Sequence, residues 1–96
     1  MPTYGRTEQF DDDWQRMAAG DRDAFRAAVK KFLADLPARK FRKGLRVKRV
    51  EGTEFFELTW AGADGRATFQ FGKEIHEGEP HIIWRRIGGH EIFRNP

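Results

Sequence analysis

The spacing of the apolar residues changes once along the chain, and this change constrains the fold more than any other feature. Between residues 10 and 36 the large apolar side chains recur every three or four positions, the period of one helix face. From residue 45 onward they alternate with polar side chains, the period of a strand. Helices followed by strands, each burying one face, predict an α+β domain.

Two amphipathic helices are predicted before residue 38. Three aspartates at residues 11–13 suit the early turns of the first helix, and Gly20 is a plausible end for it. The second helix is expected to begin near Asp21, a good N-cap, and to end at Pro37. Because the connection is short, the helices should form an antiparallel hairpin. The apolar stripes are Phe10, Trp14 and Met17 in the first helix, and Phe25, Val29, Phe32, Leu33 and Leu36 in the second.

The alternating part of the chain predicts about four strands. They cover residues 45–48, 55–60, 66–71 and 81–87, with a turn at 62–65, a polar loop at 72–80 and a tail at 90–96. Residues 3–6 give only a poor signal for an edge strand. We therefore expect one domain over residues 1–96, with the helical hairpin packed on one face of a small antiparallel sheet. The other face of the sheet would be left free for a ligand.

Composition excludes several kinds of function. The 96 residues contain no cysteine, so disulfides and cysteine-based metal sites are impossible, and there is no serine nucleophile. His76, His81 and His90 are scattered without the spacing of a metal site, and no cofactor-binding motif is present. No apolar run is long enough to cross a membrane, and residues 1–10 contain no apolar stretch of the signal-peptide kind. We expect a cytoplasmic protein that needs neither cofactor nor metal.

Positive charge is concentrated in one segment. Seven of the 18 basic residues lie between residues 39 and 50, where there is no acid. Such a segment attracts polyanions, since phosphate contacts dominate nucleic-acid affinity, although it would also suit a solvated loop. The predicted nucleic-acid contacts are Arg42, Lys43, Arg46, Lys48, Arg49 and Arg86. Arg85 and its neighbour Arg86 should point to opposite faces of the last strand, and the sequence does not show which of them faces a ligand.

A histidine near the C-terminus and cations on a sheet suggest one chemistry. Cleavage of RNA without a metal needs a base for the 2′-hydroxyl, an acid for the leaving 5′-oxygen and cations for the phosphorane. Histidine transfers protons near neutral pH. This chemistry makes His90 the candidate for proton transfer.

Four segments of the chain resemble the RelE/ParE superfamily of bacterial toxins. The family pattern is a turn with lysine and glycine, an aromatic–glutamate–leucine strand, a strand opened by glycine and arginine, and a polar tail. The matching segments are Lys48-Arg49-Val50-Glu51-Gly52, Phe56-Glu57-Leu58, Gly65-Arg66-Ala67-Thr68-Phe69 and Ile87-Gly88-Gly89-His90-Glu91-Ile92-Phe93. The resemblance implies a RelE-like fold and a toxin of a type II toxin–antitoxin system.

The resemblance assigns roles to individual residues and also shows departures. It implies that Arg66 contacts the scissile phosphate and that His90 occupies the place of a tail histidine or basic residue. Members of the RelE type carry a catalytic tail tyrosine where this chain has Phe93, which cannot transfer a proton, and lysines where it has Glu57 and Thr59. His90, together with Glu57 or Glu91, would have to supply the acid and the base. The resemblance thus makes His90, Arg66 and Glu57 the candidate catalytic residues.

The expected function is cleavage of mRNA in the ribosomal A site, with mRNA and ribosomal RNA as partners and a cognate antitoxin protein as inhibitor. The alternatives are a non-catalytic inhibitor of DNA gyrase of the ParE type, which the missing tyrosine favours, and an inactive RNA-binding relative. A small neighbouring reading frame with a DNA-binding segment would mark a toxin locus and exclude only the last of these.

Overall fold

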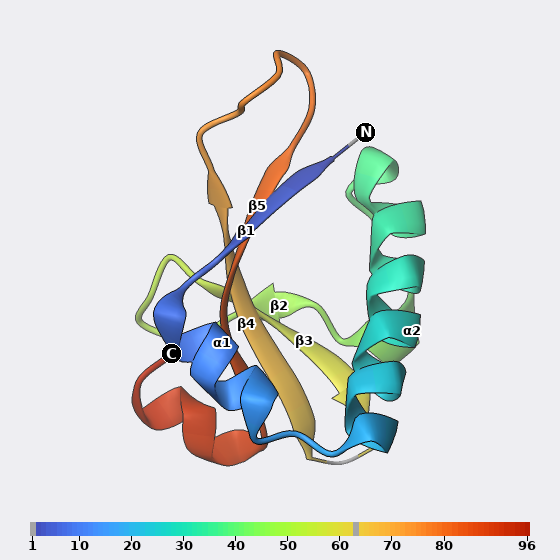
Figure 1. Ribbon diagram of the computed structural model, residues 1–96. Coiled ribbons are helices and arrows are strands. Elements are labelled where there is room, and N and C mark those ends of the chain that lie inside the picture. Colours follow the sequence, from blue (N-terminus) through green and yellow to red (C-terminus); the bar gives the residue numbers. More distant parts are fainter. Residues whose placement is uncertain (1, 63) are drawn as a thin grey trace.

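A computed structural model describes residues 2–62 and 64–96 of the chain. Five strands form a single mixed sheet in the order β1-β5-β4-β3-β2, and two α-helices and three short 3₁₀ helices surround it (Figure 1). The strands are β1 (Thr3–Arg6), β2 (Lys48–Arg49), β3 (Phe56–Ala61), β4 (Gly65–Gly72) and β5 (His81–Gly88). The helices are α1 (Glu8–Gln15), α2 (Ala19–Asp35), η1 (Leu36–Ala38), η2 (Lys43–Leu45) and η3 (His90–Arg94).

The predicted antiparallel sheet of four strands is wrong in strand number and in pairing. The weakly signalled segment at residues 3–6 is a genuine strand, and it pairs in parallel with β5, with Thr3 opposite His81. The hydroxyl of Thr3 lies 2.7 Å from Nδ1 of His81, so a side-chain hydrogen bond supports the first rung. Four residues without an alternating apolar pattern depend on this long-range pairing for their conformation.

The strand predicted at residues 45–48 is also wrong. The chain forms the 3₁₀ helix η2 over Lys43–Leu45, and Arg46 then adopts a left-handed conformation with φ of 48°. Only Lys48 and Arg49 reach β3, opposite Glu57 and Phe56. A left-handed residue cannot continue a strand, so the alternation of apolar and basic residues before residue 48 did not indicate a strand here.

Helix α1 ends earlier, at Gln15, and helix α2 begins earlier than expected. Helix α1 starts after Thr7, whose hydroxyl accepts a hydrogen bond from the Phe10 amide at 3.1 Å, as an N-cap does. Helix α2 starts at Ala19, so Gly20 and Asp21 lie inside its first turn instead of separating and capping the helices. It ends at Asp35, two residues before the predicted end at Pro37, and Pro37 lies in η1.

The hydrophobic core lies between the helices and one face of the sheet. Helix α1 packs against β5 and α2 packs against β3. Phe32 is completely buried, with its ring centroid 5.1 Å from those of Phe41 and Phe69 and 5.7 Å from that of Trp84. Leu33, predicted as part of the same stripe, is 40% exposed instead. No helix among the described residues is long and apolar enough to span a membrane.

A β-bulge between β4 and β5 determines where the two adjacent arginines lie. Thr68 pairs with Arg86 and the next residue of β4, Phe69, pairs with Trp84, so Arg85 is the extra residue. Strict alternation would place Ile87 on the face opposite Trp84. Because the bulge adds one residue, Ile87 lies on the same face as Trp84, and it is buried in the same core with 2% of its surface exposed.

The outer face of the sheet, opposite the α-helices, is partly covered by the C-terminal segment and is not free as predicted. The carbonyl oxygen of Pro96 accepts hydrogen bonds from the Thr68 hydroxyl and from Nε of Arg85, both at 3.2 Å. Ile92 of η3 is 1% exposed, and η3 contacts both β4 and β5. This segment lies at the end of the sheet nearest α1, coloured red in Figure 1.

Candidate functional site

The end of the sheet formed by the β3–β4 turn and the start of η3 brings a histidine and an aspartate together. Nδ1 of His90 lies 2.7 Å from Oδ1 of Asp64, and the His90 backbone amide donates to the same oxygen at 3.3 Å. The hydrogen bond from His90 lowers the pKa of the Asp64 carboxyl. The two side chains are 58% and 77% exposed, so a ligand can reach the pair. One ring nitrogen of His90 is held by the carboxylate, which leaves Nε2 for another partner.

Two glycines allow the tail to fold back to this position. A Cβ at Gly89 would lie 2.6 Å from oxygens of both Asp64 and Glu91, and one at Gly88 would lie 2.8 Å from Glu91. Glu91 in turn accepts a hydrogen bond from the Gly89 amide at 3.0 Å. Because these two glycines carry no Cβ, the carboxylates of Asp64 and Glu91 can approach the backbone beside His90 closely.

Arg66, predicted to bind phosphate, lies next to this pair but is buried. It is 5% exposed, and its Nη1 donates to the Gly65 carbonyl at 3.0 Å. Its charge makes a further, smaller contribution to the lowered pKa of Asp64. Arg66 and His90 thus both interact electrostatically with the Asp64 carboxyl. Direct contact between Arg66 and a substrate requires a movement that exposes the guanidinium.

Glu57, the third predicted catalytic residue, is further from His90. It pairs with Thr68 in the sheet, whereas Arg66 pairs with Thr59. Glu57 therefore lies two residues, about 7 Å, further along the strand from the β3–β4 turn than Arg66 does. It is half-buried and also faces Lys48 across the β2–β3 pair. The carboxylate next to His90 is that of Asp64, with Glu91 as the neighbouring acid.

The two arginines of β5 have different environments. Nε of Arg86 lies 2.7 Å from Oδ2 of the buried Asp13, which also accepts from the Ile87 amide at 3.1 Å. This hydrogen bond raises the pKa of Arg86. Arg85 points to the outer face, where its guanidinium lies 3.7 Å from the ring centroid of Phe55 and donates to Gln70 at 2.7 Å. Arg86, the predicted nucleic-acid contact, thus links α1 to β5.

The predicted basic segment is exposed, but its members differ in availability. The backbone and guanidinium of Arg42 donate three hydrogen bonds of 2.8–2.9 Å to Asp35, and they lower the pKa of that carboxyl to about 2. The Arg49 guanidinium lies 5.6 Å from the ring centroid of Phe56. Within the described residues, Lys43 and Lys48 form no ion pair, so they are better placed than Arg42 to bind phosphate.

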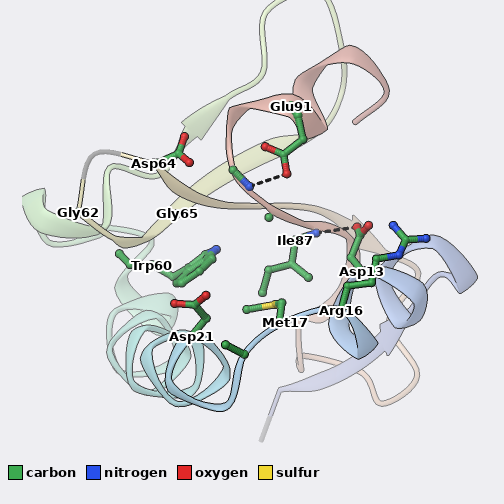
Figure 2. A pocket seen from close by; sticks show the side chains of 14 residues that line it. Asp13, Arg16, Met17, Asp21, Trp60, Gly62, Asp64, Gly65, Ile87 and Glu91 are labelled. Carbon is green, nitrogen blue, oxygen red and sulfur yellow. Dashed lines mark hydrogen bonds between the residues drawn. The ribbon is translucent and has the colours of Figure 1, made fainter.

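A pocket of about 690 Å³ adjoins the histidine–aspartate pair. Figure 2 shows its apolar part, Met17, Trp60 and Ile87, with Asp21 on one side and Glu91 on the other. Asp13 and Asp64 also line it, and Arg16 is the single basic residue among the lining residues. The pocket therefore disfavours phosphate, and an RNA chain would have to approach His90 from elsewhere.

The tail provides no second proton-transfer group in the place of the family's tyrosine. The Phe93 ring packs edge-on against the His90 ring at a centroid distance of 5.9 Å. Across residues 2–62 and 64–96, no three histidine, aspartate or glutamate side chains come together as a metal site. The residues available for proton transfer at this position are His90, Asp64 and Glu91.

Asp64 is the residue that sequence reasoning missed. The sequence predicts for it only a place in the turn at residues 62–65. A signal was present, because in an antiparallel pair the start of one strand lies beside the end of the next. Arg66 near the start of β4 pairs with Gly88 at the end of β5, which brings Asp64 and His90 together.

The comparisons with known proteins agree with this geometry at the level of fold. No family model matches the chain, and no curated protein is significantly similar to it in sequence. A chain of the RelB–RelE antitoxin–toxin complex from Methanococcus jannaschii superposes with a TM-score of 0.58, at 12% identity over 95% of both chains. The YoeB/ParE toxin from Agrobacterium tumefaciens gives 0.62, at 13% identity over 92% of this chain and 98% of that one.

YafQ from E. coli strain BL21(DE3) gives a TM-score of 0.60, at 10% identity over 95% of this chain and 96% of that one. The likeness thus extends over nearly the whole chain in all three structures. The protein therefore shares the fold of these three solved structures, and the RelE-like fold expected from the sequence is confirmed at that level.

Proposed function

We propose that this protein is the toxin of a type II toxin–antitoxin system and cleaves mRNA on the ribosome. The single observation that supports catalysis most is the exposed pair of His90 and Asp64, joined at 2.7 Å. An exposed hydrogen bond of this kind contributes little to stability. Instead, the Asp64 carboxylate orients the imidazole of His90 so that it can act as a general base.

The proposed reaction uses His90 as the base. Nε2 of His90 removes the proton of the RNA 2′-hydroxyl while Asp64 stabilises the imidazolium that forms. The 2′-oxygen attacks phosphorus, the bond from phosphorus to the 5′-oxygen breaks, and the imidazolium returns its proton to that oxygen. The products are a 2′,3′-cyclic phosphate and a 5′-hydroxyl end. The scheme needs no metal ion, and Arg66 supplies positive charge beside the reacting groups.

Binding is assigned to the exposed cations on and near the basic segment. Lys43, Arg46, Lys48 and Arg49 are exposed and can contact the backbone of mRNA or ribosomal RNA. The acidic pocket beside the histidine–aspartate pair repels phosphate and so restricts the direction of approach. The site would work in the cytoplasm, where the ribosome is, and a cognate antitoxin would keep it inactive.

The test is to induce the protein in bacterial cells and to map the 5′ ends of cellular mRNA. We expect new ends within translated regions, and these ends should disappear when translation initiation is blocked. Stalled replication without new mRNA ends would replace this proposal with inhibition of DNA gyrase. Growth without arrest and without new ends would support an inactive RNA-binding relative.

A further inference from the structure

A smaller pocket, of about 370 Å³, lies at the far end of the sheet from the histidine–aspartate pair. Residues of β3, β4 and the segment after η1 line it, and Phe71 lies six residues, about 20 Å, along β4 from Gly65. A ligand in this pocket is therefore separate from the nucleotides that react at His90. The volume falls within the range of about 300–1,000 Å³ that is usual for small-ligand pockets.

The walls of this pocket are mainly aromatic and are accessible. Phe69 belongs to the core, whereas Phe41, Phe56 and Phe71 pack against the core and are only half-buried. The Phe71 ring lies at 75° to the Phe56 ring and at 84° to the Phe69 ring, with centroid distances of 5.5 and 5.8 Å. These edge-on contacts hold the Phe71 ring in one orientation, and its face is a fixed surface on which a flat group can stack.

The pocket also contains positive charge. Arg39 and Lys48 line it together with the apolar residues, and no acidic side chain does so among the described residues. The Arg39 guanidinium lies 4.4 Å from the centroid of the Phe71 ring. Both cations are exposed, and neither forms an ion pair within the described part of the chain. A ligand that matches this lining carries a flat apolar ring and a negative charge close to it.

We propose that this pocket binds one unstacked nucleotide of single-stranded RNA, with its base on the Phe71 ring and its phosphates at Arg39 and Lys48. A guanidinium stacks on bases as it does on aromatic side chains, so the exposed Arg39 can close over the base. The proposal takes from the proposed function only that the nucleic acid is RNA, and it does not depend on cleavage.

A strand suits this site better than a free nucleotide because the positive charge continues outside the pocket. Lys40, Arg46 and Arg49 are exposed in the same basic segment but do not line the pocket, so they can contact the phosphates on either side of the bound nucleotide. The lining side chains include no amide, hydroxyl or carboxylate that could read the edge of a base. Affinity should therefore follow stacking area, and purines should bind more tightly than pyrimidines.

The first test measures binding of defined strands to the purified full-length chain. The probe is a strand of six nucleotides, five uridines and one 2-aminopurine at the third position, whose fluorescence falls when this base stacks on an aromatic ring. A control strand has the same number of phosphates but an abasic site at the third position. We expect quenching of the probe and binding of the abasic strand that is about 5- to 100-fold weaker. Equal affinities for the two strands would overturn the proposal.

A second control separates the two possible sources of the nucleotide. 2-Aminopurine riboside 5′-monophosphate offers the same base and one phosphate without the flanking nucleotides. We expect it to bind at least tenfold more weakly than the strand, because it cannot reach the cations outside the pocket. Equal binding would assign the pocket to a free nucleotide and overturn the assignment to RNA.

Matched variants locate the binding surface. Phe71 and Phe55 are both half-buried and each lies under an arginine, but Phe55 is outside the pocket. Phe71→Leu should abolish the quenching and reduce affinity to that of the abasic strand, whereas Phe55→Leu should change neither. Leucine preserves most of the apolar volume, so both variants should fold, and circular dichroism would check this. Quenching that survives Phe71→Leu would place the base elsewhere.

A charge variant does not depend on the aromatic cluster. Arg39→Gln should weaken binding of the probe roughly 5-fold, whereas Arg16→Gln, at the other pocket, should have little effect. Both arginines are exposed, so both variants should melt like the parent. Equal affinities of these two variants would contradict the assignment. Quenching by a protein that does not cleave mRNA would refute only the nuclease, and cleavage without quenching would refute only this pocket.

Discussion

Removal of the Asp13 carboxylate should destabilise the protein more than removal of any other charged side chain of α1. The side chain is 8% exposed and accepts hydrogen bonds from Arg86 and from the Ile87 amide. Loss of one member of a buried ion pair costs about 3–5 kcal/mol. Arg86 is itself 18% exposed and keeps a 3.0 Å hydrogen bond to the Asn95 carbonyl, so we expect the lower end, about 3 kcal/mol.

This loss is large for a chain of 96 residues, whose total free energy of unfolding is about 5–14 kcal/mol. The Asp13→Ala variant should melt roughly 12–24 °C below the parent. Circular dichroism during thermal and urea unfolding would measure the change. Asp12→Ala is the matched control, because Asp12 is exposed on the same helix and should cost less than about 0.5 kcal/mol. Equal melting temperatures for the two variants would refute the assignment of Asp13.

Three further predictions concern the core, the pH dependence of stability and the basic surface. Phe32→Ala should cost about 3–5 kcal/mol in urea unfolding, whereas Leu33→Ala should cost under about 1 kcal/mol, because the first side chain is buried and the second is 40% exposed. Since the pKa of Asp35 is lowered from 3.8 to about 2, the unfolded chain binds more protons between these values, and stability should fall as pH drops from 4 to 2. Asp35→Asn should flatten that part of a melting-temperature profile, and an unchanged slope would contradict the pairing. Replacing Lys43 and Lys48 with alanine should weaken ribosome binding and reduce its salt dependence by about two units of slope at most, and an unaltered slope in a sedimentation assay would exclude them as phosphate contacts.

The alternation of residues predicted most of the sheet because burial depends directly on it. The inward positions of Leu58 in β3 and of Ala67 and Phe69 in β4 follow from a period of two, and each is completely buried. The period failed in β5, where the bulge moves Ile87 into the core, and around η2, where Arg46 leaves the extended region. Both exceptions come from backbone geometry that apolar spacing does not encode.

The sequence predicted only part of the candidate site. His90 could be chosen because histidine is rare in the chain and suits proton transfer. Its partner Asp64 depends on the register between β4 and β5, and the burial of Arg66 depends on how the tail folds. The buried pair of Asp13 and Arg86 joins residues 73 positions apart, and three consecutive aspartates gave no sign of which one would be buried.

Cleavage of ribosome-bound mRNA by the parent and by a His90→Gln variant tests the central claim most directly. The pair is exposed, so His90→Gln and Asp64→Ala should melt like the parent. The account predicts that His90→Gln lowers the cleavage rate by about 10²–10⁴-fold, that Asp64→Ala lowers it by a smaller factor, and that His76→Gln on the β4–β5 loop leaves it unchanged. A His90→Gln variant that cuts mRNA as fast as the parent would contradict the account.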